Sequence, residues 1–468
     1  MQMPADFEAL MREQLGREEY EALAEALVAD PVVSVRLNSR KPGGVFASAE
    51  PVPWCPEGRY LSLRPQFTLD PLLHAGCYYV QEASSMFISH LLRTYLPEQS
   101  GLTCLDLCAA PGGKSTAAIS SLPEGSMLVS NEIDRKRARI LSENIQKWGY
   151  PNVCVTANAP ADFKGLHHTF DLIITDVPCS GEGMFRKDAG AIAEWNPAKV
   201  HECVALQRQI LRDVWDCLKP GGLLVYSTCT FNVHENEEQL QFIIDELGAD
   251  LLPISVEKTW NIHPALTGAF APSVHTTDAC RFMPHYTQGE GLFMAVLRKH
   301  TDNTVPDKRP YKKSLKKETG KQHNDRKSDS SDETLTRWLN LPVHLHENKD
   351  GSIRAIPKLL ENLYNLLTEN RLFILSAGIE LGVRKGRDVQ PAQALALSSA
   401  LASDAFSTAE LDIETALNYL RRESIVLPPS IPRGYVLLTY QQTPLGFVKN
   451  IGNRCNSLYP MEWRIRNL

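Results

Sequence analysis

A repeated alternation of apolar strands and amphipathic helices between residues 76 and 298 constrains the fold more than any other feature of this sequence. Short apolar runs typical of buried strands occur at residues 102–107, 127–131, 153–156, 171–175 and 223–227. Helical patterns separate them, and the longest covers residues 199–218 and stops at Pro220-Gly221-Gly222. Strands that alternate with helices predict an α/β fold, with a Rossmann-like parallel sheet covered by helices on both faces.

Two smaller regions flank this predicted sheet. Residues 5–29 carry apolar side chains at helical spacing and residues 32–38 form a strand pattern, so we expect a small α/β domain over residues 1–75. Residues 301–333 are polar and predict a linker between a 76–300 domain and a C-terminal region, 334–468. In that region we expect wholly or partly helical segments at 335–341 and 359–367 and a helix at 410–422. We also expect a hairpin of strands 435–440 and 445–451 with a four-residue turn.

The composition excludes several classes of protein. The 468 residues are 43% hydrophobic and contain no apolar run of 18 residues, so we expect no membrane span. Asp6 and Glu8 stand where a secretory signal would need a basic start and an apolar run. The eleven cysteines form no C-x-x-C pair, which argues against zinc ribbons and disulfide scaffolds. We expect a cytoplasmic monomer without a bound metal.

The charge is unevenly distributed along the chain. The formal net charge of −6 argues by itself against nucleic acid as a partner, but residues 298–327 contain eleven Lys/Arg and four Asp/Glu, a net of +7. Because phosphate binding depends on local charge, this segment is interpreted either as an RNA contact or as a solvated linker. Other basic residues that we consider for phosphate contacts are Arg36, Arg186, Lys187, Lys449, Arg454, Arg464 and Arg466.

The first chemical signal is a small-residue loop after the first predicted strand, Asp106-Leu107-Cys108-Ala109-Ala110-Pro111-Gly112-Gly113-Lys114. Glycines there let backbone N–H groups approach a ligand closely. The loop matches neither G-x-G-x-x-G nor the phosphate-binding P-loop, so it is either an ordinary tight turn or a different cofactor site. Glu132 follows Gly113 by nineteen residues, the spacing at which an acid binds ribose hydroxyls. Together these features predict a nucleoside cofactor such as S-adenosyl-L-methionine.

Two cysteines and one acid follow the later strands. Asp176 and Cys179 come after the strand at 171–175, and Cys229 after the strand at 223–227. Ligands of open α/β sheets bind beyond the carboxyl ends of the strands, so we expect these side chains in one site. A single cysteine is most often a buried apolar group, yet this arrangement matches a chemical need. A thiolate that adds to carbon 6 of a pyrimidine makes carbon 5 nucleophilic, and an acid near N3 stabilises the charge that develops on the ring.

These motifs resemble those of the Sun-type RNA cytosine-5 methyltransferases. The resemblance rests on the loop at 108–114, on Asp176-Val177-Pro178-Cys179 with Ser180-Gly181-Glu182-Gly183, and on Ser227-Thr228-Cys229-Thr230. Four further segments resemble the RsmF (YebU) branch, which acts on 16S ribosomal RNA: Met184-Phe185-Arg186-Lys187-Asp188, His234-Glu235-Asn236-Glu237, Gly289-Glu290-Gly291-Leu292-Phe293 and Leu445-Gly446-Phe447. The resemblance covers about residues 30–300 strongly and the C-terminal part weakly.

The resemblance implies a class I methyltransferase sheet, an N-terminal domain like those that bind RNA, and a C-terminal α+β region that ends in a PUA-like module. It implies that Cys229 is the nucleophile, that Cys179 helps to release the product, that Asp176 holds the cytosine ring and lies near the methyl donor, and that Lys114 lies close to the donor and the base. Cys108, Ala109, Ala110, Pro111, Gly112, Gly113, Lys114, Glu132 and Asp176 would bind S-adenosyl-L-methionine. Many relatives carry an adenine-contacting acid after the third strand, where this sequence has Asn158. Either the Asn158 amide takes over the hydrogen bond to adenine, which adds it to the cofactor-binding residues, or the contact is lost.

Several alternatives stay open at this point. The residues alone do not decide which cysteine attacks, since DNA cytosine-5 methyltransferases use the cysteine of a Pro-Cys motif, here Cys179. Those enzymes also need Glu-Asn-Val after it, whereas Glu143-Asn144-Ile145 precedes it. The leading interpretation is methylation of 16S rRNA, free or in the small ribosomal subunit. The others are a tRNA, DNA or small-molecule methyltransferase, and a non-catalytic rRNA-binding assembly factor.

Overall fold

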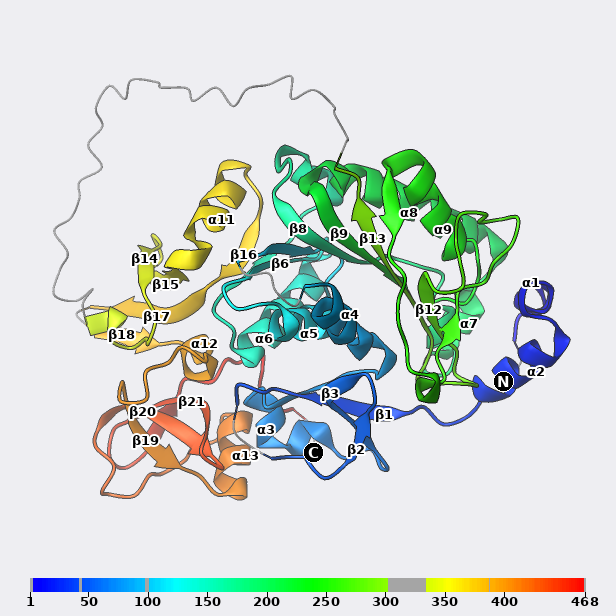
Figure 1. Ribbon diagram of the computed structural model, residues 1–468. Helices are drawn as coiled ribbons and strands as arrows, with labels where there is room; N and C mark the ends of the chain where they lie inside the picture. The colour runs from blue at the N-terminus through cyan, green and yellow to red at the C-terminus, as the bar shows by residue number, and fades with distance from the viewer. Residues whose placement is uncertain (1–2, 42–43, 97–100, 302–333, 387, 467–468) are drawn as a thin grey trace, which may run out of the picture.

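A computed structural model describes residues 3–41, 44–96, 101–301, 334–386 and 388–466, which form four sheets and the helices around them (Figure 1). The central sheet has ten strands, and each of the other three has four. The predicted linker, apart from Thr301, lies outside the described residues, as does most of the basic 298–327 segment.

The N-terminal sheet has the strand order β2-β3-β1-β4. Gly16, with a φ of 88°, divides the helical pattern of residues 5–29 into two helices. The sheet extends past residue 75, because β4 pairs with β1. The elements of this part are α1 (Ala5–Leu15), α2 (Arg17–Ala26), β1 (Val33–Leu37), β2 (Glu50–Val52), β3 (Cys55–Leu61), α3 (Pro71–His74) and β4 (Tyr78–Val80).

The central sheet has the order β11-β12-β13-β9-β8-β5-β6-β7-β16, with β10 paired to β13. Neighbours within β9-β8-β5-β6-β7 are parallel, as the alternating pattern predicted. Its strands are β5 (Thr103–Asp106), β6 (Met127–Asn131), β7 (Val153–Thr156), β8 (Phe170–Asp176), β9 (Leu218–Thr228), β10 (Ala249–Leu251), β11 (His263–Pro264), β12 (Ala279–Phe282), β13 (Leu292–Lys299) and β16 (Ile374–Ala377). The accompanying helices are α4 (Phe87–Tyr95), α5 (Gly113–Ser121), α6 (Arg135–Trp148), α7 (Ala189–Glu194), α8 (Pro197–Val214) and α9 (Glu237–Phe242).

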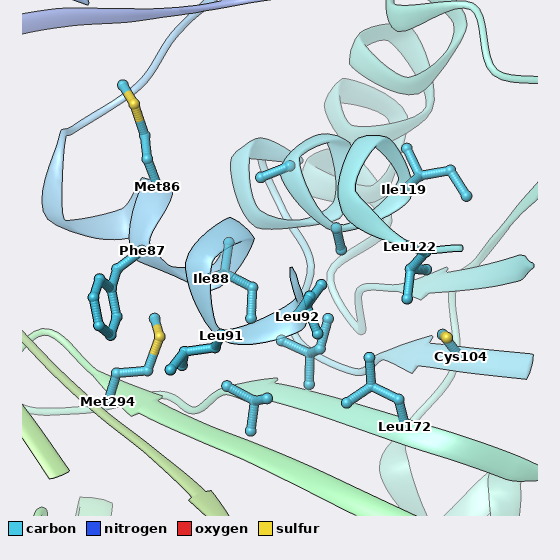
Figure 2. Packing of buried hydrophobic residues seen from close by; sticks show 14 of the residues in the cluster. Met86, Phe87, Ile88, Leu91, Leu92, Cys104, Ile119, Leu122, Leu172 and Met294 are labelled. Carbon is cyan, nitrogen blue, oxygen red and sulfur yellow. The ribbon is translucent and has the colours of Figure 1, made fainter. Parts of the chain in front are cut away.

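Two hydrophobic cores lie on the two faces of the central sheet. Leu172 and Ile174 of β8 belong to one core and Ile173 between them to the other, as the two-residue period of a strand requires. On the first face α4 and α5 pack against the strands, and Figure 2 shows Leu91 and Leu92 of α4 above the strand that carries Leu172. Full burial of one such leucine contributes about 1.5–3 kcal/mol, so both faces stabilise the sheet.

The C-terminal part completes the central sheet as well as forming its own. β16 pairs antiparallel with β7, and α11 adds Leu360, Leu363 and Leu367 to the second core. Neither this strand nor the separate sheet β14-β15-β17-β18 was predicted from the sequence. The elements are β14 (Val343–Glu347), β15 (Ser352–Pro357), α11 (Lys358–Glu369), β17 (Ile379–Lys385), β18 (Asp388–Pro391) and α12 (Gln393–Leu397).

The last sheet, β19-β20-β21-β22, packs with α13 against the N-terminal domain, so the two ends of the chain share one core (Figure 1). The predicted hairpin is formed by β20 and β21, but its turn contains two residues, Gln441 and Gln442, both with positive φ, and not four. The segment 335–341, expected to be wholly or partly helical, is helical only up to residue 336 in the described chain. The elements are β19 (Ser407–Glu410), α13 (Ile413–Arg421), β20 (Gly434–Tyr440), β21 (Thr443–Asn450) and β22 (Cys455–Ser457).

Candidate active site

The carboxyl ends of the parallel strands meet at one edge of the central sheet. Asp106 ends β5, Asp176 ends β8, and Cys229 follows the last residue of β9. β8 lies between β5 and β9 in the sheet, with Asp176 beside Ser227 in register. The predicted loop after β5 and the two cysteine segments therefore lie along the same edge, where open α/β sheets bind ligands.

The backbone of the loop between β5 and α5 lies close to neighbouring side chains. Gly112 has a φ of 112°, and a Cβ there would lie 3.2 Å from Leu141 Cδ1, so a larger residue would be both strained and crowded. Arg137 donates from Nη2 to the carbonyl oxygen of Ala110 at 2.9 Å. α5 begins directly at Gly113, so the unpaired N–H groups of its first turn lie at the end of the loop, as a ligand-binding loop requires.

Asp106 lies fully buried beside this loop. Ser115 Oγ donates to its Oδ2 at 2.6 Å, whereas Oδ1 has no hydrogen-bond partner among the residues that the structure describes. Burial raises the pKa of Asp106 to about 7, against the opposing effect of the Ser115 hydrogen bond, and the nearby charges of Asp176 and Glu132 raise it further. A buried carboxylate oxygen without a partner is a site at which a polar ligand group would be accepted.

Glu132 follows β6 and is 3% exposed. The backbone N–H of Asp134 donates to its Oε1 at 3.0 Å, and Arg137 Nη1 lies 3.3 Å from its Oε2. These contacts hold the carboxylate in place but leave lone pairs for a ribose hydroxyl. Burial, together with the charges of Asp106, Asp176 and Glu132, raises the pKa of Cys108 in this loop, so three acidic groups lie close to it.

Asn158 is nearly buried and pairs with the backbone of one residue that precedes β16. Its Nδ2 donates to the carbonyl oxygen of Phe373 at 3.2 Å, and its Oδ1 accepts from the N–H of Phe373 at 2.8 Å. One N–H and one oxygen lone pair of the amide are therefore available for other partners. A contact from Asn158 to an adenine ring stays a prediction, and the observed role is to join β16 to the sheet.

Lys114 and Asp176 form an ion pair beside the cysteines. Lys114 Nζ lies 2.8 Å from Asp176 Oδ2, and Ser227 Oγ donates to Asp176 Oδ1 at 2.8 Å. Burial alone would lower the pKa of Lys114, but the charge of Asp176 and their hydrogen bond together raise it above its ordinary value. The Lys114 side chain is 12% exposed and that of Asp176 is 35% exposed, so the carboxylate is the more accessible of the two to a substrate.

The two predicted cysteines meet directly. Cys179 Sγ and Cys229 Sγ lie 3.2 Å apart, and both side chains are partly exposed. The hydrogen bond with Cys229, reinforced by burial, raises the pKa of Cys179 well above its ordinary value. Cys179 therefore keeps its proton at neutral pH, and a thiol in that state can donate a proton but is a weak nucleophile.

Four polar residues around the cysteines received no role from the sequence. Glu182, Gln207, Asn232 and Glu235 are fully buried and hydrogen-bonded to one another or to the cysteine segments. Glu182 and Glu235 are part of motifs that the resemblance used, but their neighbours in the fold come from distant parts of the chain. The available signal was an acid in each of the segments that follow the two cysteines.

Two of the predicted phosphate contacts are wrong. Arg36 is 1% exposed, donates to Gln81 Oε1 at 2.8 Å and to Thr116 Oγ1 at 2.6 Å, and stacks on Trp148. Arg186 is also buried and bonds to the carbonyl oxygens of Ala26 and Gly289. Both guanidinium groups bond to other parts of the protein and are therefore not available to bind phosphate. The side chain of Lys187 is 36% exposed, and four exposed candidates remain in the C-terminal part: Lys449, Arg454, Arg464 and Arg466.

Two kinds of feature are absent from the described part of the chain. No cluster of three or more His, Cys, Asp or Glu side chains there is arranged to hold a metal ion. No helix there has the length and apolarity that crossing a membrane requires.

Comparison with known proteins decides the family. Residues 3–83 match the N-terminal domain of 16S rRNA methyltransferase RsmF, residues 93–298 match 16S rRNA methyltransferase RsmB/F, and residues 406–465 match the methyltransferase RsmF PUA domain. Ribosomal RNA small subunit methyltransferase F from Aliivibrio fischeri (strain MJ11) is 32% identical, over 88% of this chain and 85% of the relative. The chain belongs to the RsmF family of methyltransferases. Ribosomal RNA small subunit methyltransferase F from Serratia proteamaculans (strain 568) is 30% identical to this chain, over 88% of this chain and 84% of the relative.

A solved structure shares the fold of the central part of this RsmF-family protein. A methyltransferase homolog protein from Pyrococcus horikoshii has a TM-score of 0.53 and 28% identity, and the likeness covers 63% of this chain and 94% of that one. The predicted fold class is thereby confirmed: a Rossmann-like methyltransferase sheet, an N-terminal α/β domain and a C-terminal PUA domain.

Proposed function

We propose that this RsmF-family methyltransferase transfers a methyl group from S-adenosyl-L-methionine to carbon 5 of a cytosine in 16S rRNA, through a covalent bond between Cys229 and carbon 6. The single observation that carries the proposal is the pair of cysteine sulfurs, 3.2 Å apart, at adjacent strand ends beside Lys114 and Asp176. The names of the relatives support ribosomal RNA of the small subunit as the substrate, and the cytoplasm as the compartment.

The protein's own groups account for each step. The Cys229 thiolate adds to carbon 6, and Asp176, which is partly exposed and linked to Lys114, faces the charge that develops at N3. S-adenosyl-L-methionine, held by the 108–114 loop and Glu132, supplies the electrophilic methyl group. Water then takes the proton from carbon 5, and the electron pair of that C–H bond restores the ring double bond as the bond between carbon 6 and Cys229 breaks. The protonated Cys179 gives its proton to the leaving thiolate and regains one from solvent.

The nucleophile is tested by Cys229→Ser. The rate of methyl transfer to 16S rRNA should fall at least about a thousandfold in this variant, because a serine hydroxyl at neutral pH is a far weaker nucleophile than a thiolate. Binding of S-adenosyl-L-methionine should stay unchanged, since the loop at 108–114 is untouched. Tritium transfer to rRNA and calorimetry of cofactor binding measure the two quantities.

The control for that variant is Cys203→Ser, which changes a partly exposed cysteine on α8 and should keep full activity. Undiminished methyl transfer by Cys229→Ser would overturn the assignment. Bisulfite sequencing of rRNA from cells with and without this protein then identifies the modified base, and an unchanged pattern of 5-methylcytosine would reject the proposed reaction.

The release role is tested by Cys179→Ala. Without the thiol that reprotonates Cys229, the covalent protein–RNA adduct should accumulate and turnover should fall. A denaturing gel separates the adduct from free protein. Normal turnover without an adduct would remove Cys179 from the mechanism, and an adduct that forms through Cys179 in the Cys229→Ser variant would assign the attack to Cys179.

A further inference from the structure

Each cysteine segment is held by an acid that belongs to the other segment. Glu182, three residues after Cys179, accepts hydrogen bonds from the backbone N–H groups of Phe231, at 2.6 Å, and Asn232, at 3.1 Å. The N–H of Gly183 donates to the carbonyl oxygen of Cys229 itself at 2.8 Å. The Cys179 segment therefore fixes the backbone that carries Cys229 and the residues after it.

The reverse contacts come from Glu235, six residues after Cys229. Glu235 Oε2 accepts from the backbone N–H of Ser180 at 3.0 Å. Gln207 of α8 donates from Nε2 to both Glu235 Oε2, at 2.8 Å, and the carbonyl oxygen of Pro178, at 2.9 Å. Both peptide groups that flank Cys179 are therefore held by Glu235 and Gln207.

Asn232 joins the two halves. Its Nδ2 lies 2.8 Å from Glu182 Oε1 and 2.9 Å from Glu235 Oε1, so one amide group serves both acids. Asn232, Glu182 and Glu235 are all fully buried. Two buried carboxylates are unfavourable for folding unless donors satisfy them, and an apolar core would stabilise the fold equally well. Their presence beside the cysteines needs another explanation than stability.

We propose that Glu182, Asn232, Glu235 and Gln207 form a reciprocal clamp of positioning residues that holds the backbone segments of the two cysteines at a fixed spacing during the reaction. The inference rests on the proposed function, because it assigns the clamp to the covalent pathway. Cys229 must leave Cys179 to reach carbon 6 and must meet it again for its elimination. A clamp on the backbone lets the side chains rotate while the two segments keep their spacing.

Different residues of the clamp act on different steps of the reaction. Glu235 and Gln207 hold the peptide groups around Cys179, so their loss affects release of the methylated product. Glu182 holds the chain after Cys229, so its loss affects formation of the adduct. Neither acid contacts the loop at 108–114 through a hydrogen bond in the described structure, so affinity for S-adenosyl-L-methionine is independent of both.

The experiment compares Gln207→Met with Gln209→Met in the full-length chain. Methionine keeps the length and volume of glutamine but donates no hydrogen bond, and Gln209 is an exposed residue of the same helix that bonds only to Asp213. Formation and decay of the covalent adduct with a 16S rRNA fragment are followed by quenched time points on denaturing gels. Gln207→Met should slow adduct decay about tenfold, with adduct formation and cofactor affinity unchanged, and Gln209→Met should match the wild type.

A double variant separates positioning from general damage. If Gln207 acts through Cys179, then Gln207→Met added to Cys179→Ala slows adduct decay no further than Cys179→Ala alone. An additional tenfold slowing in the double variant, or equal slowing of formation and decay in the single variant, would overturn the clamp. Glu182→Gln gives an independent reading: it should slow adduct formation while decay stays as in the wild type, and the opposite split would also overturn the clamp.

The same gels test the proposed function and the clamp separately. If neither the wild type nor Cys179→Ala forms a covalent adduct, the proposed function is rejected and the clamp with it. If Cys179→Ala traps the adduct and Gln207→Met releases it at the wild-type rate, the proposed function stands and the clamp is rejected.

Discussion

At the scale of single residues, Asp106 shows how one buried group shapes the site. Its carboxylate lies under the cofactor loop with one oxygen unpartnered, and its pKa is raised to about 7 chiefly by burial. The raised pKa means that the folded protein binds this proton more tightly than the unfolded chain does. Its contribution to stability is therefore present at low pH and is lost as the pH rises from about 4 to about 7.

Asp106→Asn should remove this pH dependence. Asparagine can still accept the hydrogen bond from Ser115, and it carries no charge. The free energy of unfolding of the variant minus that of the wild type should therefore rise by about 2 kcal/mol between pH 5 and pH 8. For a protein of this size we expect the difference in Tm between the two proteins to move by roughly 2–4 °C. Thermal unfolding at both pH values measures it.

Asp134→Asn is the matched control. Asp134 is an exposed N-cap of α6 whose pKa is lowered, mainly by the backbone N–H of Arg137. It is charged at both pH 5 and pH 8, so its replacement should lower Tm by the same amount at each. A Tm difference for Asp106→Asn that is equal at the two pH values would contradict the assigned pKa.

At the scale of elements, the end of α6 docks the C-terminal part onto the methyltransferase sheet. Gly149 ends this helix with a φ of 85°, and its carbonyl oxygen accepts from the N–H of Ser399 at 2.9 Å. A Cβ at this position would lie 2.2 Å from the carbonyl oxygen of Leu397, at the end of α12. The left-handed cap and the close approach of two backbones both require glycine here.

Gly149→Ala should therefore destabilise the protein more than a glycine substitution without a close neighbour. Gly125 has a similar φ of 81°, but a Cβ there would meet nothing nearer than 3.6 Å. Alanine at Gly125 should add only the strain of a left-handed residue, about 1–2 kcal/mol, whereas alanine at Gly149 must also separate α6 from α12. A Tm for Gly149→Ala equal to that of Gly125→Ala would show that this contact is easily displaced.

At the scale of the whole molecule, the C-terminal part is integrated into the enzyme. β16 covers the edge of β7, and Leu360, Leu363, Leu367 and Leu372 belong to the same core as the parallel strands. The last sheet shares a further core with the N-terminal domain (Figure 1). Val52, Trp54 and Tyr60 of the N-terminal domain belong to the first core of the central sheet. The central sheet is therefore buried in part by both ends of the chain.

A chain that ends at Lys299 should be poorly stable and prone to aggregation. The deletion removes the four buried leucines, whose burial contributes about 6–12 kcal/mol of stabilisation, and exposes the apolar strands that they cover. It also opens the edge of β7, which can then pair with other chains. Size-exclusion chromatography and thermal unfolding measure both effects. Co-expression of residues 334–468 as a separate chain should recover a monodisperse complex, and a monomeric 1–299 fragment with the Tm of the full chain would contradict this dependence.

The sequence by itself determined the parallel strands, the loop at 108–114 and the position of both cysteines at strand ends. Those features depend on local periodicity and on the rule that parallel strands share one carboxyl edge, so a linear pattern is sufficient. Only the tertiary structure decided that Arg36 and Arg186 are buried, that Asn158 bonds to Phe373, and that Glu182 and Glu235 exchange backbone contacts. Each of these joins residues that are far apart in the chain, and their meeting depends on how whole segments pack, which no local pattern records.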